Sequence, residues 1–152
     1  MGLKIGEKAP NFTLDSTSGE QFTLYDSVGN EPCIIYFYPK DFTSVCTEQA
    51  CSFRDEFGAF RDLGVTVIGI SKDDIETHLR FKEEYKLPFE LLADTKGKVA
   101  KLYDSLLPIV SIPKRNTFVL AGDKTIMDIQ SDLTSGKSKI REVVENLTKK
   151  FE

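Results

Sequence analysis

Short runs of apolar residues mark the expected strands of this chain. The runs at 33–38 and 65–70 are continuous and rich in β-branched and aromatic residues, and Pro39 ends the first, which is typical of strands buried on both faces. Apolar residues flank the turn-forming segment 16–19 in two short alternating stretches, 12–14 and 21–24, which predict a β-hairpin. Further strands are expected at 91–93, 117–120 and 125–129.

Between these runs the apolar residues recur at helical spacing. From 47 to 63 one face carries Ala50, Phe53, Phe57 and Phe60, so we expect a single helix there. Gly64 is a residue type that typically ends a helix. A second, amphipathic helix is expected at 73–84, where Ile75, Leu79 and Phe81 stand among charges. A short helix at 98–102 and a closing helix at 138–151 complete the order.

This order of elements predicts an α/β fold. We expect a central mixed β-sheet with helices on both faces and an N-terminal β-hairpin. The 152 residues suit one hydrophobic core, and the sequence has neither an internal repeat nor a long linker. Residues 1–152 are therefore expected to form a single domain.

The charge balance argues against a nucleic-acid partner. The net charge is -4 and the isoelectric point is near 5.2, whereas phosphate binding requires a clustered basic surface. No apolar run approaches the roughly 20 residues of a membrane-spanning helix, and the first residues lack the apolar stretch of a signal peptide. We expect no membrane association and a cytoplasmic location.

Three cysteines, Cys33, Cys46 and Cys51, carry the candidate chemistry. They do not form a secreted disulfide framework, which normally uses an even number in a shorter chain. In a reducing compartment they rest as thiols, so a close pair suggests reactivity. Cys33 falls within a predicted core strand, where we expect a structural role.

Cys46 stands where a buried strand has ended and a helix begins. The first turn of a helix has unpaired N–H groups and the positive end of the helix dipole, which would stabilise a thiolate. The alternative is that Cys46 packs as a small apolar side chain, because it precedes Ala50 by four residues and shares the face of the phenylalanines. Both interpretations remain open at this point.

Cys51 lies near enough to condense with a sulfenic acid on Cys46. Residues five apart on an ideal helix have Cα atoms roughly 8 to 9 Å apart, whereas a disulfide usually needs them within about 7 Å. If both cysteines lie on an intact helix when reduced, bonding them requires its first turns to unwind. We therefore predict a redox-driven change of order at this helix start.

The sequence lacks the residues that other cysteine-based or phosphate-binding sites require. Iron–sulfur clusters need about four ligands, and one of the three cysteines is assigned to the core. A cysteine hydrolase needs a histidine base, and the one histidine, His78, lies in a charged helix, where we expect a solvated surface residue. There is no phosphate-binding loop and no Cys-x-x-Cys motif.

The pattern Pro39-x-x-x-Thr43-x-x-Cys46 resembles the active-site signature of the peroxiredoxins. The flanking YFYPKDFT and the later VIGIS at 67–71 are also similar, and the resemblance covers nearly the whole chain. A second cysteine five residues on is similar to the bacterioferritin-comigratory or Q-type subfamily, whose members form that disulfide within one chain. The resemblance implies a thioredoxin-like fold.

By this resemblance Cys46 is the peroxidatic nucleophile and Cys51 the resolving thiol. Thr43 would hydrogen-bond the peroxide, and Pro39 would shield the thiolate from water. Arg115 matches the arginine that the family brings beside the thiolate, where a fixed cation favours the ionised sulfur and can bind the oxygens of the breaking O–O bond. The alternative for Arg115 is an exposed loop residue.

The chain departs from the subfamily at two places. Ser44-Val45 stands where Pro-Gly often precedes the cysteine, which blurs the subfamily assignment. Gln49 stands where glutamate is frequent and could alter how the helix start is tied to Arg115. With no cysteine in the C-terminal region, an intersubunit disulfide is not expected.

The resemblance implies a peroxidase that needs no bound cofactor or metal. It would reduce hydrogen peroxide and organic hydroperoxides, be recycled by thioredoxin or a similar dithiol protein, and act as a monomer. Two rival functions remain. One is a thiol-disulfide oxidoreductase on the same fold, which the absence of Cys-x-x-Cys disfavours; the other is a redox-sensing binding module.

Overall fold

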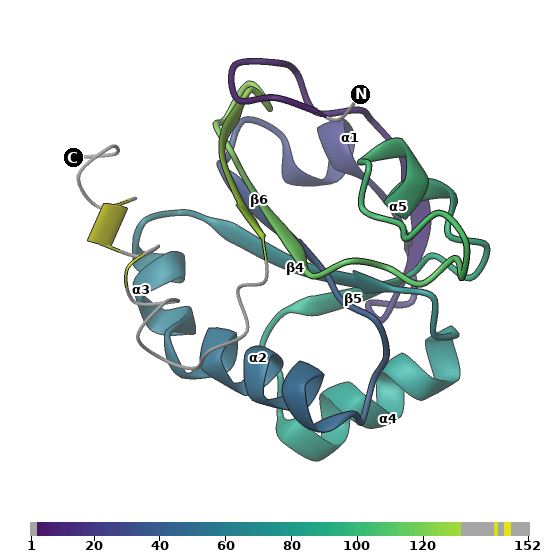
Figure 1. Ribbon diagram of the computed structural model, residues 1–152. Coiled ribbons are helices and arrows are strands. Elements are labelled where there is room, and N and C mark those ends of the chain that lie inside the picture. Colours follow the sequence, from purple (N-terminus) through teal and green to yellow (C-terminus); the bar gives the residue numbers. More distant parts are fainter. Residues whose placement is uncertain (1–2, 132–141, 143–144, 147–152) are drawn as a thin grey trace.

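A computed structural model describes residues 3–131, 142 and 145–146 of the chain. Helices and strands alternate through most of its length (Figure 1). In chain order they are β1 (Thr13–Ser16), β2 (Gln21–Thr23), α1 (Leu24–Val28), β3 (Cys33–Phe37), α2 (Ser44–Asp55), α3 (Phe57–Asp62), β4 (Thr66–Ser71), α4 (Ile75–Tyr85), β5 (Glu90–Ala93), α5 (Lys98–Leu102), β6 (Asn116–Leu120) and β7 (Ile126–Ser131).

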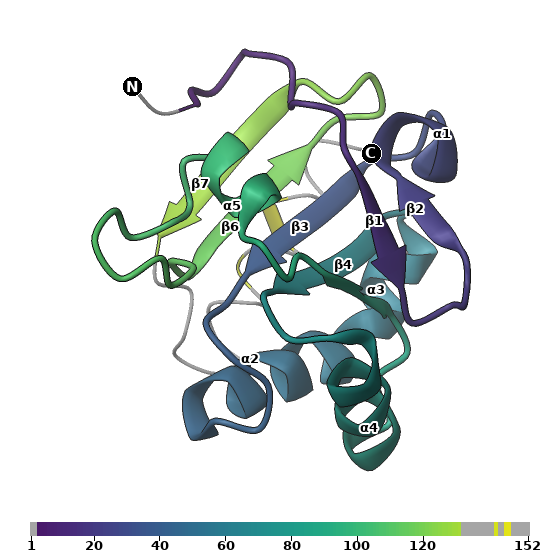
Figure 2. The ribbon, with the colours of Figure 1, turned by 90° about the vertical axis from the view of Figure 1, so that its right-hand side faces the viewer.

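The strands form one seven-stranded mixed sheet in the order β2-β1-β5-β4-β3-β6-β7 (Figure 2). β3 pairs with β4 in parallel and with β6 antiparallel, and β1 pairs with β2 as the expected N-terminal hairpin. Every residue of β3 is buried, as its continuous apolar run predicts. The predicted α/β fold with a central mixed sheet is confirmed.

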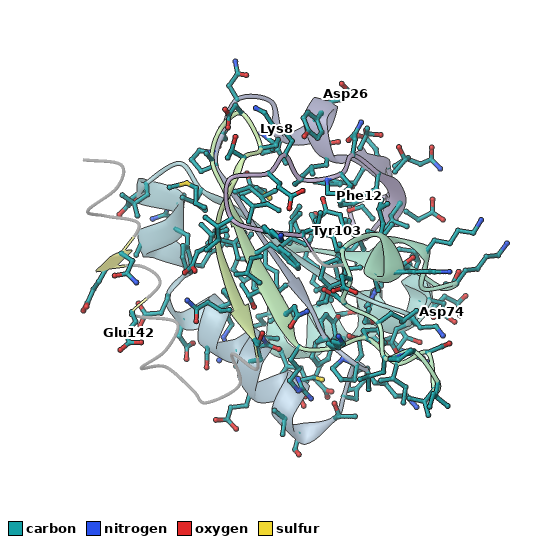
Figure 3. All side chains as sticks on the ribbon, turned by 45° about the horizontal axis from the view of Figure 1, so that its top comes forward. Lys8, Phe12, Asp26, Asp74, Tyr103 and Glu142 are labelled. Atoms are coloured by element: carbon teal, nitrogen blue, oxygen red, sulfur yellow. The ribbon has the colours of Figure 1, made fainter. Side chains whose placement is uncertain are left out.

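Helices cover both faces of the sheet, and Figure 1 shows the two layers on opposite sides. The side chains of Tyr36 and Val67 point to the face covered by α2, α3 and α4, where they pack with Phe53 and Phe60. Ile35 and Ile70 point to the other face, beside the N-terminal segment, α1 and α5. On that face Phe12 and Tyr103 lie side by side in the interior, with ring centroids 5.8 Å apart (Figure 3).

Three expected elements differ from the structure. The helix expected at 47–63 is two helices, because the backbone at Glu56 leaves the helical conformation between α2 and α3. Leu24, read as the end of a strand, instead begins α1 with a buried side chain. Leu79 was placed on the apolar face of α4 but is 44% exposed. The closing helix expected at 138–151 falls largely on residues outside the described part.

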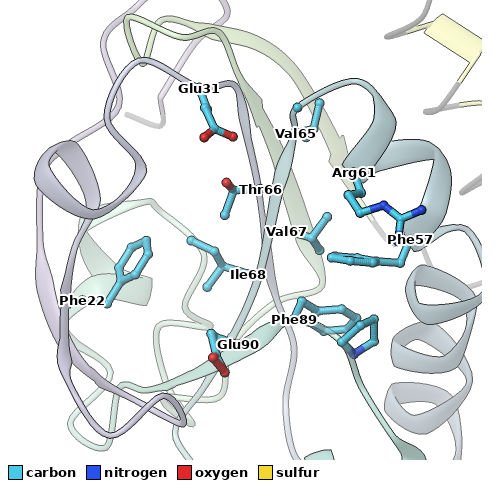
Figure 4. A pocket seen from close by; sticks show the side chains of 12 residues that line it. Phe22, Glu31, Phe57, Arg61, Val65, Thr66, Val67, Ile68, Phe89 and Glu90 are labelled. Carbon is cyan, nitrogen blue, oxygen red and sulfur yellow. The ribbon is translucent and has the colours of Figure 1, made fainter.

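An apolar pocket of about 300 Å³ lies beside the first half of β4 (Figure 4). β5 pairs with β4 only from Ile68 onward, so one edge of β4 opens into the pocket before that residue. Phe22, Phe57 and Phe89 line it, and no residue of the segment from Pro39 to Cys51 does.

None of the helices in the described ranges combines the length and the apolar character that crossing a membrane would require.

Candidate active site

The start of α2 follows the end of β3 by a short loop. Thr43 is the N-cap in an extended conformation, and its carbonyl accepts the first helical hydrogen bond from Thr47 N at 2.9 Å. The N–H groups of Ser44, Val45 and Cys46 therefore lie in the first turn, before any helical acceptor is available. No acidic residue lies in this turn. The positive end of the helix is directed at the segment that carries Cys46.

Cys46 is 1% exposed and packs in the same cluster as Tyr36, Ala50 and Phe53. Its backbone belongs to the first turn of α2, while its side chain lies on the apolar face of the helix. The two interpretations from the sequence thus describe one residue: the sulfur packs as a small apolar group and also lies within the field of the helix start.

Thr43 and Pro39 belong to the loop that leads into α2. The Thr43 hydroxyl donates to the carbonyl oxygen of Lys40 at 2.8 Å. A hydroxyl has one hydrogen to donate. Thr43 Oγ1 can therefore form further hydrogen bonds only as an acceptor. Phe42, which directly precedes Thr43, has a φ of 65°, a strained value for an aromatic residue, and its ring packs against Phe81 with centroids 5.1 Å apart.

Arg115 reaches the helix that carries Cys46. Its Nη1 atom donates to Oε1 of Gln49 at 3.5 Å, and Gln49 lies one turn beyond Cys46 and is buried. Arg115 also lines a surface hollow of about 610 Å³ together with Pro39, Leu107 and Ile112. The half-buried arginine is thus connected to the helix and is not a free loop residue. The sequence analysis expected that Gln49 could alter how the helix start is tied to Arg115, and this hydrogen bond shows how the two side chains are joined here.

His78 overturns an expectation from the sequence, because it is completely buried. Its Nδ1 atom lies 2.5 Å from Asp41 Oδ2, and its Nε2 atom lies 2.9 Å from the carbonyl oxygen of Leu92. The Tyr38 hydroxyl donates to Asp41 Oδ1 at 2.5 Å. The prediction of a solvated surface residue was wrong because it relied on the charged residues next to His78 in the sequence. Its spacing of three from both Ile75 and Phe81 was the signal for the buried face of α4.

Hydrogen bonds extend from this pair to β4. Asp73 Oδ2 accepts from the backbone N–H of Asp41 at 2.8 Å and from the Ser71 hydroxyl at 2.5 Å. Asp41, Asp73 and His78 bring potential metal ligands within 4.8 Å of one another. Hydrogen bonds link Asp41 to both of the other residues, so the cluster is a polar network that ties the loop before Cys46 to the core.

Tyr36 contributes a second buried hydroxyl, and this one has no hydrogen-bond partner among the described residues. Burial raises the pKa of Tyr36 most, and the charges of Asp41, Cys46 and Cys51 raise it further. A buried hydroxyl left without a partner costs about 1–3 kcal/mol.

Cys51 lies on the same unbroken helix as Cys46, and both are free thiols. Cys46 is buried and Cys51 is half-buried, as expected for side chains about 140° apart around a helix. Burial raises the pKa of the Cys51 thiol, Arg54 lowers it and Asp55 raises it. Cys33 is on the opposite face of the sheet with no exposure, and burial raises its pKa far above the ordinary value.

Comparison with known proteins shows the family to which the chain belongs. The family model described as AhpC/TSA matches residues 5–129. The chain belongs to the AhpC/TSA family. It is 44% identical over 104 residues to Peroxiredoxin Bcp of Bacillus subtilis, covering 68% of this chain and 66% of the relative. It is 40% identical over 143 residues to the chloroplastic Peroxiredoxin Q of Oryza sativa subsp. japonica, covering 93% of this chain and 65% of the relative.

The chain spans about two thirds of the length of these relatives. Among solved structures, peroxidoxin BcpB of Mycobacterium tuberculosis has a TM-score of 0.89 at 28% identity and covers 97% of both chains. PrxQ of Xylella fastidiosa, at 24% identity with a TM-score of 0.90, covers 100% of this chain and 99% of its own and supports the fold alone. The resemblance to Bcp and Q-type peroxiredoxins is confirmed, and with it the thioredoxin-like fold and the prediction of an enzyme.

Proposed function

We propose that this chain is a thiol peroxidase in which Cys46 reduces peroxides and Cys51 resolves the oxidised sulfur. The observation that carries the proposal is the position of Cys46 in the first turn of α2, beside the N-cap Thr43 and one turn from the Gln49 that Arg115 binds. The peroxiredoxin relatives support the reaction type. The roles of the individual residues rest on this arrangement and on the family resemblance.

In the first step the Cys46 thiolate attacks one oxygen of the peroxide. The S–O bond forms as the O–O bond breaks, and the leaving oxygen takes a proton to give water or an alcohol, with a sulfenic acid on Cys46. Thr43 Oγ1, whose own hydrogen is donated to Lys40, accepts the hydrogen bond of the peroxide O–H. The guanidinium of Arg115 stabilises the charge on the separating oxygens.

Pro39 closes the loop side of this site and has no N–H group that could attract water. The hollow that it shares with Arg115 is bordered by the apolar side chains of Leu107 and Ile112. An alkyl group would find apolar contacts there, while hydrogen peroxide would need only the polar groups. Both hydrogen peroxide and organic hydroperoxides are therefore proposed substrates.

In the second step the Cys51 sulfur attacks Cys46 and displaces the sulfenic oxygen as water, which leaves a disulfide. Because α2 is continuous through both cysteines in the reduced structure, its first turns must open before the sulfurs can meet. A dithiol protein of the thioredoxin type then exchanges its two thiols for the disulfide and restores the enzyme. By the family resemblance we propose a monomer as the working unit, and we propose the cytoplasm as its location.

A stopped-flow assay of peroxide consumption by the reduced protein tests the peroxidase. We expect rapid consumption that Cys46→Ser abolishes, and Cys33→Ala should retain it because Cys33 lies on the opposite face of the sheet. A thiol-disulfide oxidoreductase or a redox-sensing module would consume peroxide slowly. Equal slow rates in the parent and Cys46→Ser would therefore overturn the proposal in favour of those rivals.

Amide hydrogen exchange over residues 42–56 tests the opening of the helix. We expect strong protection in the reduced protein and faster exchange once peroxide has joined Cys46 to Cys51. Protection that is the same in both redox states would contradict the opening. Cys51→Ser should consume one equivalent of peroxide rapidly and then recycle poorly with thioredoxin, and full steady-state activity in that variant would contradict its resolving role.

A further inference from the structure

The backbone of Phe42 is left-handed directly before the helix that must open. Its φ of 65° lies in the region that glycine favours and that is strained for a bulky side chain. In the described part of the chain, the other non-glycine residues with a positive φ are all polar or charged, namely Lys86, Asp104, Ser111 and Lys124. An aromatic residue in this conformation therefore marks the loop before α2 as a strained segment.

The chain before Phe42 is fixed by contacts that do not involve α2. The backbone N–H of Asp41 donates to Asp73 Oδ2 at 2.8 Å, and the Asp41 carboxylate lies 2.5 Å from Nδ1 of the buried His78. The Phe42 ring itself packs against Phe81 of α4, with centroids 5.1 Å apart. Opening the start of α2 breaks none of these contacts. One side of the strained residue therefore stays in place when the helix opens.

The chain after Phe42 belongs to the helix start. Thr43 is the N-cap of α2, and its carbonyl oxygen accepts the hydrogen bond from Thr47 N at 2.9 Å that begins the helix. Unwinding the first turns removes this bond, so Thr43 is no longer held in one orientation relative to Asp41. The backbone of Phe42 is then held on one side only and can return to a negative φ. Its strain thus belongs to the closed form of the helix start.

We infer that Phe42 is a positioning residue for disulfide formation, because its left-handed backbone raises the energy of the closed form of α2 and not that of the opened form. The step concerned is the one in which the Cys51 sulfur displaces water from the sulfenic acid on Cys46. Strain in the closed form raises the fraction of molecules with an open helix start, and the two sulfurs meet only in those molecules. The inference rests on the proposed function, since it concerns the resolving step.

Phe42→Gly and Phe42→Ala together test this role. Both variants lack the ring, and they differ in strain, because glycine adopts a left-handed backbone freely and alanine does not. After one equivalent of peroxide, Phe42→Gly should form the Cys46–Cys51 disulfide about fivefold more slowly than Phe42→Ala, measured by rapid mixing. Phe42→Gly should also have the higher melting temperature of the two when reduced, and an equal or lower one as the disulfide.

Lys86→Gly and Lys86→Ala are the matched controls, because the exposed Lys86 has a φ of 52° at the C-cap of α4, away from the helix that opens. Their melting temperatures should differ by the same amount in both redox forms, and their rates of disulfide formation should be equal. If the two Phe42 variants behave in this way, or if Phe42→Gly forms the disulfide faster, the inference is overturned. Absence of any Cys46–Cys51 disulfide in the peroxide-treated parent, seen by mass spectrometry, would instead overturn the proposed function itself.

Discussion

The Nδ1 atom of His78 lies 2.5 Å from Oδ2 of Asp41, and neither side chain has any exposure to solvent. Since His78 Nε2 faces the Leu92 carbonyl, it must carry a hydrogen and donate it. One further proton then lies between the imidazole and the carboxyl group. The pair joins α4 and β5 to the loop after β3, which is the loop that leads to Cys46. It ties the segment that contains the strained Phe42 to the core.

Replacing His78 with alanine should destabilise the reduced protein by about 3 kcal/mol, because Asp41 and the Leu92 carbonyl would lose their partner in the core. Urea denaturation measures this change. Peroxide consumption should also slow, because the loop that holds Pro39 and Thr43 would lose a fixed point. Glu76→Ala, an exposed change on the same helix, should alter stability by less than about 0.5 kcal/mol. A loss in His78→Ala no larger than in this control would disprove the structural role.

Arg115→Met should slow the peroxide step by about 100-fold, the usual effect of removing one donor to a developing oxyanion. Methionine keeps much of the length of the side chain but removes its charge and its bond to Gln49. Arg115→Lys should recover only part of the rate, because lysine restores the positive charge but not the planar guanidinium with its paired N–H donors. Stopped-flow rates over a range of peroxide concentrations would measure both. A rate in Arg115→Met within twofold of the parent would remove Arg115 from the mechanism.

Much of the fold could be predicted from the sequence because apolar runs report burial directly. β3 and β4 were identified as strands buried on both faces, and all five residues of β3 are buried. The break at Glu56 could not be predicted, since the phenylalanines of α2 and α3 continue one face across it. The continuous apolar face gave no sign of this local change of backbone conformation.

The candidate site was predicted in part. Thr43, Cys46 and Cys51 fall on α2 and its N-cap as the motif implies, and Arg115 is attached to the same helix through Gln49. The polar network around His78 was missed because its partners come from separate elements, and a residue's neighbours in sequence do not reveal them.

Cys33 should resist alkylation in the folded protein. Burial raises its pKa far above that of an ordinary thiol, so little thiolate forms at neutral pH, and no path from solvent reaches a side chain with no exposure. Iodoacetamide at pH 8 should label Cys51 before Cys33, because Cys51 is half-buried whereas Cys33 is fully buried. Mass spectrometry of a time course gives the order. Labelling of Cys33 before unfolding would show that the sheet opens more readily than its packing implies.

The rate of disulfide formation should keep rising with pH beyond 9.0, the ordinary pKa of a cysteine thiol, because burial raises the pKa of Cys51. Below its pKa the group is a protonated thiol and a poor nucleophile, so each step toward higher pH increases the reactive thiolate. Two neighbours provide opposite controls. Asp55→Asn should move the profile to lower pH, since the Asp55 charge raises the pKa of Cys51, and Arg54→Met should move it to higher pH, since Arg54 lowers it. Rapid-mixing experiments with one equivalent of peroxide would record the profiles. If the two variants shift in the same direction, Cys51 is not the group whose ionisation limits the step.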